Sequence, residues 1–159
     1  MNVIELGTGP AVMIIHGSPT PIADFQPIVE RLATQYRVLM PELPGYGSSP
    51  PTDDVSFARI GNELAQLLIE RDCVRPHALI GFSSGAYRAL DLALQRGIEP
   101  DVIVGLGSLA SLDEADRALF RTVAAALRQD PSATGLRAIV PDRWLSPAWR
   151  AEHPEDDAR

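Results

Sequence analysis

The sequence contains no lysine. Its 14 basic residues are all arginines, and it has 21 acidic residues. A formal charge of −7 leaves little basic surface for phosphate groups, so we expect no nucleic-acid partner. The single cysteine, Cys73, has no partner for an internal disulfide. No apolar run is long enough to cross a bilayer, and the first residues lack the basic start of a signal peptide. We therefore expect a cytoplasmic protein that does not bind membranes.

With 159 residues, of which 45% are hydrophobic, the chain is large enough to bury a core without metals or disulfides. No group of His, Cys and Asp has the spacing of a metal site, and we expect neither a metal nor a cofactor. A loose G-x-G-x-x-A pattern at residues 105–110 leaves a nucleotide-binding domain as an alternative. The pattern follows the last predicted strand, whereas the dinucleotide-binding pattern follows the first.

Short apolar runs alternate with segments of helical periodicity along the first two-thirds of the chain. Gly and Pro at residues 7–10 predict a tight turn, and hence a hairpin, between the first two strands. The alternation predicts a three-layer α/β fold, a mostly parallel sheet with helices on both faces. The predicted strands are residues 3–6, 11–15, 36–40, 77–80 and 101–106, and the predicted helices are residues 22–34, 55–71 and 84–96.

The pattern changes after residue 110, which divides the chain into a core of residues 1–110 and a second segment of residues 111–159. A helix is predicted over residues 113–128, with Ser111 as its N-cap and Glu114 completing a capping box. Prolines interrupt the rest of the segment, and its polar end is expected to fray.

The sequence Gly81-Phe82-Ser83-Ser84-Gly85 lies between a predicted strand and a predicted helix. A G-x-S-x-G in this context is typical of a nucleophile elbow, in which the serine occupies a strained turn and its hydroxyl stands above the sheet. Ser83 is therefore the candidate nucleophile. The alternative is a Gly/Ser-rich turn without chemistry, which in other proteins cradles anions.

The sequence His16-Gly17-Ser18 follows the second strand and is the candidate oxyanion-binding turn. A serine nucleophile needs N–H groups aimed at the oxygen on which negative charge develops. The N–H of Ser84 is one candidate and that of Ser18 the other, with Gly17 as second choice, because Pro19 has no N–H. His77 begins its strand at the opposite end of the sheet and is expected to be structural.

A third motif, Pro41-Glu42-Leu43-Pro44-Gly45-Tyr46-Gly47-Ser48-Ser49, follows the third strand. The three motifs in this order resemble the α/β-hydrolase family, and most closely its enol-lactonase and esterase-like members. The resemblance implies that residues 111–159 form a partial helical cap and tail, and that Tyr46, Trp144 and Trp149 line a substrate pocket. It also implies that His16 lies beside Ser83, where it either orients the loop or serves as a makeshift base.

The chain departs from this family in two places. Glu42 replaces the usual Asp of the loop motif, and the two later strands that carry the acid and histidine are absent. Asp113 and His153 satisfy the family's Ser, acid, His order nominally. The resemblance implies a serine hydrolase that cleaves carboxylic esters or lactones through a Ser83 acyl-enzyme, with modest activity. The alternative is a truncated, non-catalytic member that serves as an interaction or binding module.

The last predicted strand would leave an apolar edge open, which favours pairing with another chain. We therefore expect a homodimer, formed either by pairing of this edge or by exchange of the helices of residues 113–150.

Overall fold

The computed structural model describes residues 1–18, 20, 22–108, 111–129 and 147–152. The chain divides into two compact units, Met1–Leu109 and Ala110–Arg159, which are described separately. Within the described ranges, no helix combines the length and apolar character that crossing a membrane requires.

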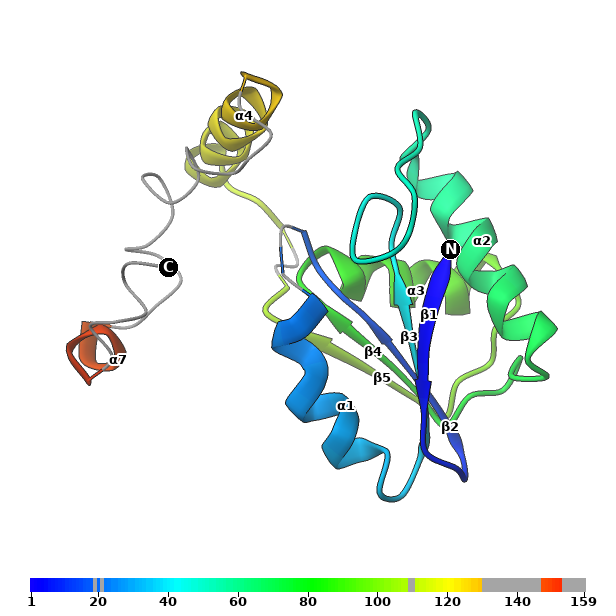
Figure 1. Cartoon of the computed structure of the whole chain (residues 1–159). Helices are drawn as coiled ribbons and strands as arrows, with labels where there is room; N and C mark the ends of the chain where they lie inside the picture. The colour runs from blue at the N-terminus through cyan, green and yellow to red at the C-terminus, as the bar shows by residue number, and fades with distance from the viewer. Residues whose placement is uncertain (19, 21, 109–110, 130–146, 153–159) are drawn as a thin grey trace. The chain divides into compact units, whose positions relative to one another are not determined.

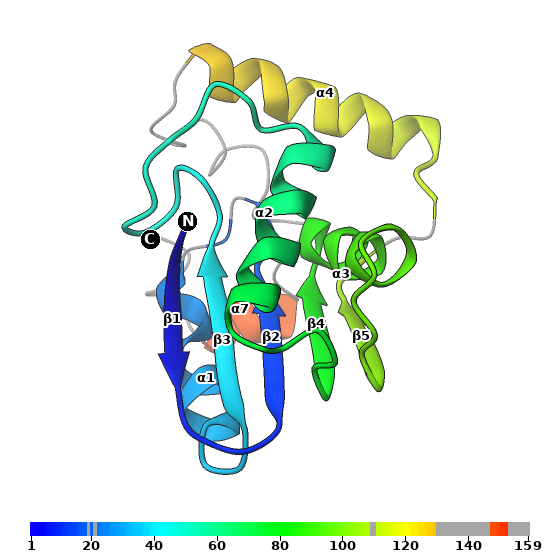
Figure 2. The ribbon, with the colours of Figure 1, turned by 90° about the vertical axis from the view of Figure 1, so that its right-hand side faces the viewer.

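The first unit is built on one five-stranded sheet with the order β1-β3-β2-β4-β5 (Figure 2). β1 runs antiparallel to β3, and the other neighbouring strands run parallel. This arrangement confirms the predicted mostly parallel α/β sheet. The strands are β1 (Asn2–Leu6), β2 (Ala11–Ile15), β3 (Arg37–Glu42), β4 (Ala78–Phe82) and β5 (Val102–Leu106).

The predicted hairpin between the first two strands is wrong, because β3 lies between β1 and β2. The connection through residues 7–10 passes close under the segment that leads into β3. A Cβ at Gly9 would lie 2.8 Å from the carbonyl oxygen of Gln35, and the N–H of Arg37 donates to the carbonyl oxygen of Pro10. The same turn residues suit a hairpin and this crossing, and only the pairing of β3 separates the two.

Helices cover both faces of the sheet, as the periodicity predicts (Figures 1 and 2). η1 (Ile22–Phe25) and α1 (Gln26–Leu32) lie on one face, and α2 (Phe57–Glu70) and α3 (Ser84–Gln95) on the other. The predicted helix of residues 22–34 thus begins as a 3-10 turn, and Pro27 occupies the first turn of α1, where its missing N–H costs nothing.

Two apolar clusters form the core because successive strand side chains point to opposite faces. Met13 and Leu79 pack with the helices of the α2 and α3 face. Val12 and Ile14 pack with Phe25 and Val29 on the α1 face. The carboxyl ends of β2, β3 and β4 meet at one edge of this core, where the three sequence motifs follow.

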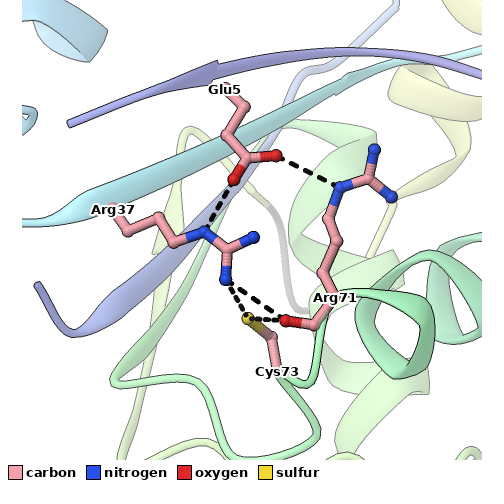
Figure 3. Close-up of polar contacts among 4 residues, drawn as sticks. All are labelled: Glu5, Arg37, Arg71 and Cys73. Carbon is pink, nitrogen blue, oxygen red and sulfur yellow. Dashed lines mark hydrogen bonds and ion pairs between the residues drawn. The ribbon is translucent and has the colours of Figure 1, made fainter. Parts of the chain in front are cut away.

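One polar cluster connects elements at the other end of the sheet, away from the carboxyl ends of β2, β3 and β4 (Figure 3). The carboxylate of Glu5 on β1 accepts from Nε of Arg37 at 2.7 Å and from Nε of Arg71 at 3.3 Å. Nη1 of Arg37 also donates to the carbonyl oxygen of Arg71 at 3.2 Å and contacts Sγ of buried Cys73 at 3.4 Å. The cluster joins β1, β3 and the end of α2.

The second unit contains α4 (Glu114–Gln129) and α7 (Pro147–Glu152). The predicted N-cap of α4 is wrong by two residues: Oδ1 of Asp113 accepts from the N–H of Asp116 at 2.8 Å. A carboxylate at the helix start also suits the helix dipole better than a hydroxyl. Arg121 and Glu114 pair on the surface of this helix.

Candidate active site

Ser83 occupies a strained turn between β4 and α3. Its φ of 51° and ψ of −118° are a backbone conformation that L residues seldom adopt, and Asp72 is the only other described non-glycine residue with positive φ. Such strain costs about 1–3 kcal/mol and concentrates at functional sites. The Ser83 side chain does not cap α3, and the residue is only half-buried. The turn therefore displays the hydroxyl as a nucleophile elbow requires.

The two glycines that flank Ser83 are required by close backbone contacts. A Cβ at Gly81 would overlap the backbone of Ala86, and one at Gly85 would overlap the carbonyl oxygen of Ile15. Both positions lie where α3 approaches the sheet. The glycines of the G-x-S-x-G motif thus allow the sharp reversal that the sequence predicts.

The His16-Gly17-Ser18 turn lies against Ser83, because β2 and β4 are parallel neighbours in which Ile15 pairs with Gly81. A Cβ at Gly17 would stand 2.8 Å from Cβ of Ser83, so only glycine lets the turn approach the nucleophile this closely. The N–H of Ser84 opens α3 on the other side of Ser83. Two segments distant in sequence thereby lie next to Ser83, and the proposed oxyanion-binding role of their N–H groups stays a prediction.

His16 is fully buried, and both of its ring nitrogens are engaged. The N–H of Leu43 points to Nε2 at 3.0 Å, and Nδ1 lies 2.8 Å from the carbonyl oxygen of Gly17. Because a backbone N–H only donates, Nε2 carries no proton and Nδ1–H donates to Gly17. Burial lowers the pKa of His16 and keeps the ring neutral. These bonds favour the loop-orienting role of His16 over the base role.

Tyr46 lies beside the same turn. Its ring centroid is 4.6 Å from that of His16, and its hydroxyl forms a hydrogen bond with Oγ of Ser18. Tyr46 thus connects the loop after β3 to the candidate oxyanion-binding turn. That Tyr46 lines a substrate pocket stays a prediction.

Glu42 organises the loop that carries Tyr46. Its buried carboxylate accepts from the N–H of Ser48 at 2.7 Å and from Nδ2 of Asn2 at 2.8 Å. A Cβ at Gly47 would overlap this carboxyl group, so the glycine makes room for the longer acidic side chain. Glu replaces Asp here without leaving a buried charge unsatisfied.

Sequence reasoning missed Arg88 on α3. Its guanidinium carbon stands 4.7 Å from the ring centroid of Phe57, while Nε and Nη1 are buried without a hydrogen-bond partner. The available clue was a charged residue three positions after Gly85 and four before Leu92, on the face of α3 that periodicity assigns to the core.

The remaining predicted residues lie in the second unit. Asp113 caps α4, and Trp149 lies in α7. Trp144 and His153 lie outside the described residues. Among the described residues, Oγ of Ser83 has no hydrogen-bond partner, so none of them is placed as its base. His77 pairs with Asp101 at the other end of the sheet, 3.0 Å away, as expected of a structural residue.

Two further expectations concern the described residues. No three His, Cys, Asp or Glu side chains gather there as metal ligands would. The first described helix after the 105–110 glycine pattern begins at Glu114, so no helix among the described residues opens directly at that turn. The geometry therefore gives the nucleotide-binding alternative no support.

The sequence matches the profile of the Alpha/beta hydrolase family over residues 12–158. It is similar to the pimeloyl-[acyl-carrier protein] methyl ester esterase of Aeromonas hydrophila, with 34% identity over 70% of this chain and 41% of that protein. The chain thus spans less than half the length of this curated relative.

Two solved structures share the fold. An esterase from Thermogutta terrifontis superposes with a TM-score of 0.83 and 24% identity, over 99% of this chain and 58% of that one. The enol-lactonase of Burkholderia xenovorans LB400 gives a TM-score of 0.77 with 18% identity, over 99% of this chain and 61% of that one. With the elbow, the adjoining turn and the sheet order in place, the chain belongs to the alpha/beta hydrolase family.

Proposed function

We propose that this chain carries the nucleophile and oxyanion-binding elements of a serine hydrolase that cleaves carboxylic esters or lactones. The observation that carries the proposal is the strained, uncapped Ser83 with the Gly17 backbone against it. Similarity to proteins named esterase and enol-lactonase supports this substrate class.

In the proposed reaction, these groups act in the following order. Oγ of Ser83 attacks the carbonyl carbon, its proton passes to a base, and the carbonyl electrons move onto the oxygen. The N–H groups of Ser84 and Ser18 stabilise that oxyanion. Collapse expels the alcohol, which takes up the proton, and leaves an acyl-enzyme that water hydrolyses. In this scheme the neutral His16 fixes the turn by its bonds to Gly17 and Leu43.

By the family's chain order alone, Asp113 and His153 are the candidates for the acid and the base of this scheme. Asp113 also caps α4, so an alanine variant would confuse helix stability with catalysis. Asp113→Asn retains the cap and removes the acid, and we expect it to lower turnover at least about a hundredfold without a loss of helix content. His153→Gln should lower turnover at least as far. Unchanged turnover in both variants would refute this assignment and leave the Ser83 proposal standing.

The proposal is tested by reaction of the folded protein with a fluorophosphonate, followed by peptide mass spectrometry. This reagent reports an activated serine rather than a merely exposed one. We expect one adduct, on Ser83, which Ser83→Ala abolishes. Ser84→Ala is the matched control, because it removes the neighbouring hydroxyl and keeps the N–H. No adduct under conditions that label an ordinary serine esterase would favour the alternative, a non-catalytic interaction or binding module.

A further inference from the structure

Arg88 is a half-buried cation to which this mechanism gives no role. Its Nε and Nη1 are inaccessible to solvent and have no hydrogen-bond partner, and Arg88 forms no salt bridge with any described residue. Burial lowers the pKa of its guanidinium, which nonetheless stays charged at neutral pH. Buried donors without partners are rare in native proteins, so these two nitrogens are candidates for binding a ligand.

The carboxylate nearest along the helix does not satisfy Arg88. Asp91 is three residues further on, but its Oδ2 accepts from Nε of Arg96 at 3.0 Å. Arg96 donates in turn to Oδ1 of Asn62 on α2. The charge of Asp91 opposes the lowering of the Arg88 pKa, but Arg88 forms no ion pair with any described carboxylate, whereas the neighbouring Arg96 does.

The position of Arg88 links it to the Ser83 site. Arg88 follows Ser84 by four residues, so the two share one face of α3 about 6 Å apart along its axis. Helical side chains lean toward the N-terminus, which directs the guanidinium toward the Ser83 end of the helix. Burial is the main cause of the lowered pKa of His16, and the charge of Arg88 lowers it further, which agrees with this proximity.

The ring that contacts the guanidinium is partly exposed. Phe57 is the first residue of α2 and is 44% exposed, although its ring stacks on Arg88. Because Nε and Nη1 are buried, ligand binding there requires a side-chain movement, and Phe57 is the ring that contacts the guanidinium. A carboxylate offers two oxygens in the geometry that a guanidinium binds best.

We propose that Arg88 binds a free carboxylate on the acyl part of the substrate, so that the preferred substrates are short monoesters of dicarboxylic acids. This inference rests on the proposed serine hydrolase function, because that function places the ester carbonyl of the substrate at Ser83. The anion site itself is testable without turnover.

Binding is measured by calorimetry in the Ser83→Ala background, in which no ester is consumed. The probes are monomethyl glutarate, its neutral diester dimethyl glutarate, and sodium sulfate at matched ionic strength. We expect monomethyl glutarate to bind at least about tenfold more tightly than the diester, and Arg88→Gln to remove that preference. Arg88→Lys should retain part of it. Arg59→Gln, which removes a surface arginine on α2, should leave it unchanged.

Three results would overturn the proposal: equal binding of the monoester and the diester, an undiminished preference in Arg88→Gln, or sulfate binding as tight as that of the monoester. Failure of the hydrolase proposal is distinguishable, since it would appear as missing fluorophosphonate labelling in the wild-type chain while the carboxylate preference persists.

A second variant separates binding from a structural role. Arg88→Met keeps the length of the side chain and removes an unpaired buried charge, so we expect its unfolding temperature to equal or exceed that of the wild type. A fall of several degrees would show that the guanidinium stabilises the fold through Phe57, and would contradict a ligand-binding role.

Discussion

Gly85 lies where α3 touches β2, and the residue has no space for a side chain. A Cβ there would overlap the carbonyl oxygen of Ile15, which is held in the sheet. We predict that Gly85→Ala lowers the free energy of unfolding by at least about 2 kcal/mol, because sheet and helix must separate to admit the methyl group. Urea denaturation measures the change.

Gly45 provides the matched control for this substitution. It has a φ of +84°, and a Cβ added to it would meet no atom within 4 Å. Gly45→Ala should therefore cost about 1 kcal/mol, from backbone strain alone. If both substitutions lower the free energy of unfolding equally, steric crowding is not the reason for glycine at position 85.

His16 should make stability depend on pH in a defined direction. Burial places its folded-state pKa below the unfolded value of about 6.5. Its contribution is therefore complete above that value and is lost as the pH falls through the folded-state pKa, because the unfolded chain takes up the proton first. We predict that His16→Asn costs about 1–3 kcal/mol at pH 7.5, since the N–H of Leu43 loses its buried acceptor.

The measurement is the unfolding free energy of the wild type and of His16→Asn between pH 7.5 and pH 5. The difference between the two proteins should shrink as the pH falls. His77→Asn serves as control, since His77 is at the other end of the sheet and partly exposed. A stability difference that stays constant across this pH range would contradict a neutral His16 with both ring nitrogens hydrogen-bonded.

The role of single residues could be predicted from sequence where the chemistry is local. Ser83 and the glycines around it follow from one short motif whose strand and helix context is readable. The role of His16 stayed open, because its two hydrogen-bond partners come from Gly17 and from Leu43, which β3 brings to it. Arg88 was missed because only the packing of α2 on α3 shows that its donors are buried without partners.

At the scale of elements, Glu5 joins three parts of the first unit (Figure 3). The hydrogen bond from Arg37, and secondarily that from Arg71, hold the pKa of Glu5 below its usual range. We predict that Glu5→Gln lowers stability by about 0.5–1 kcal/mol at neutral pH and low salt, a modest figure because these groups are partly exposed. The difference should vanish as the pH falls through the folded-state pKa of Glu5, below about 4.3.

Glu99 is the control for this cluster. It pairs only with Arg75, in an ion pair whose two side chains are largely exposed. Chemical denaturation of Glu99→Gln should show a loss of less than about 0.3 kcal/mol. An effect of Glu99→Gln as large as that of Glu5→Gln would mean that bridging two arginines adds nothing to the stability of the sheet.

Elements were easier to predict than their pairing. Each strand and helix of the first unit was found within a few residues, because apolar periodicity is a local property. The placement of β3 between β1 and β2 was not found, since residues 7–10 suit either connection. The N-cap of α4 was misplaced for a related reason: Ser111 and Asp113 are both good capping residues, and only the hydrogen bond to Asp116 distinguishes them.

At the scale of the whole molecule, β5 ends the sheet of the described chain. It pairs with β4 on one side, and no described strand pairs with its other side. Its side chains are apolar and open: Val102 is 47% exposed and Leu106 is 45% exposed. The structures to which the chain is similar extend well beyond the matched part, since the chain covers 58% of the Thermogutta terrifontis esterase. An open apolar edge of this kind favours pairing with another strand.

We propose that a second copy of the chain occupies this edge and forms a homodimer. Light scattering should give twice the chain mass at high micromolar concentration. A lysine on an edge strand opposes pairing, so Val102→Lys should shift the protein toward monomer. Val55→Lys places the same charge on an exposed valine before α2 and should leave the dimer intact. A dimer that survives Val102→Lys would favour exchange of the helices of residues 113–150 instead, and a wild-type monomer at high concentration would exclude both arrangements.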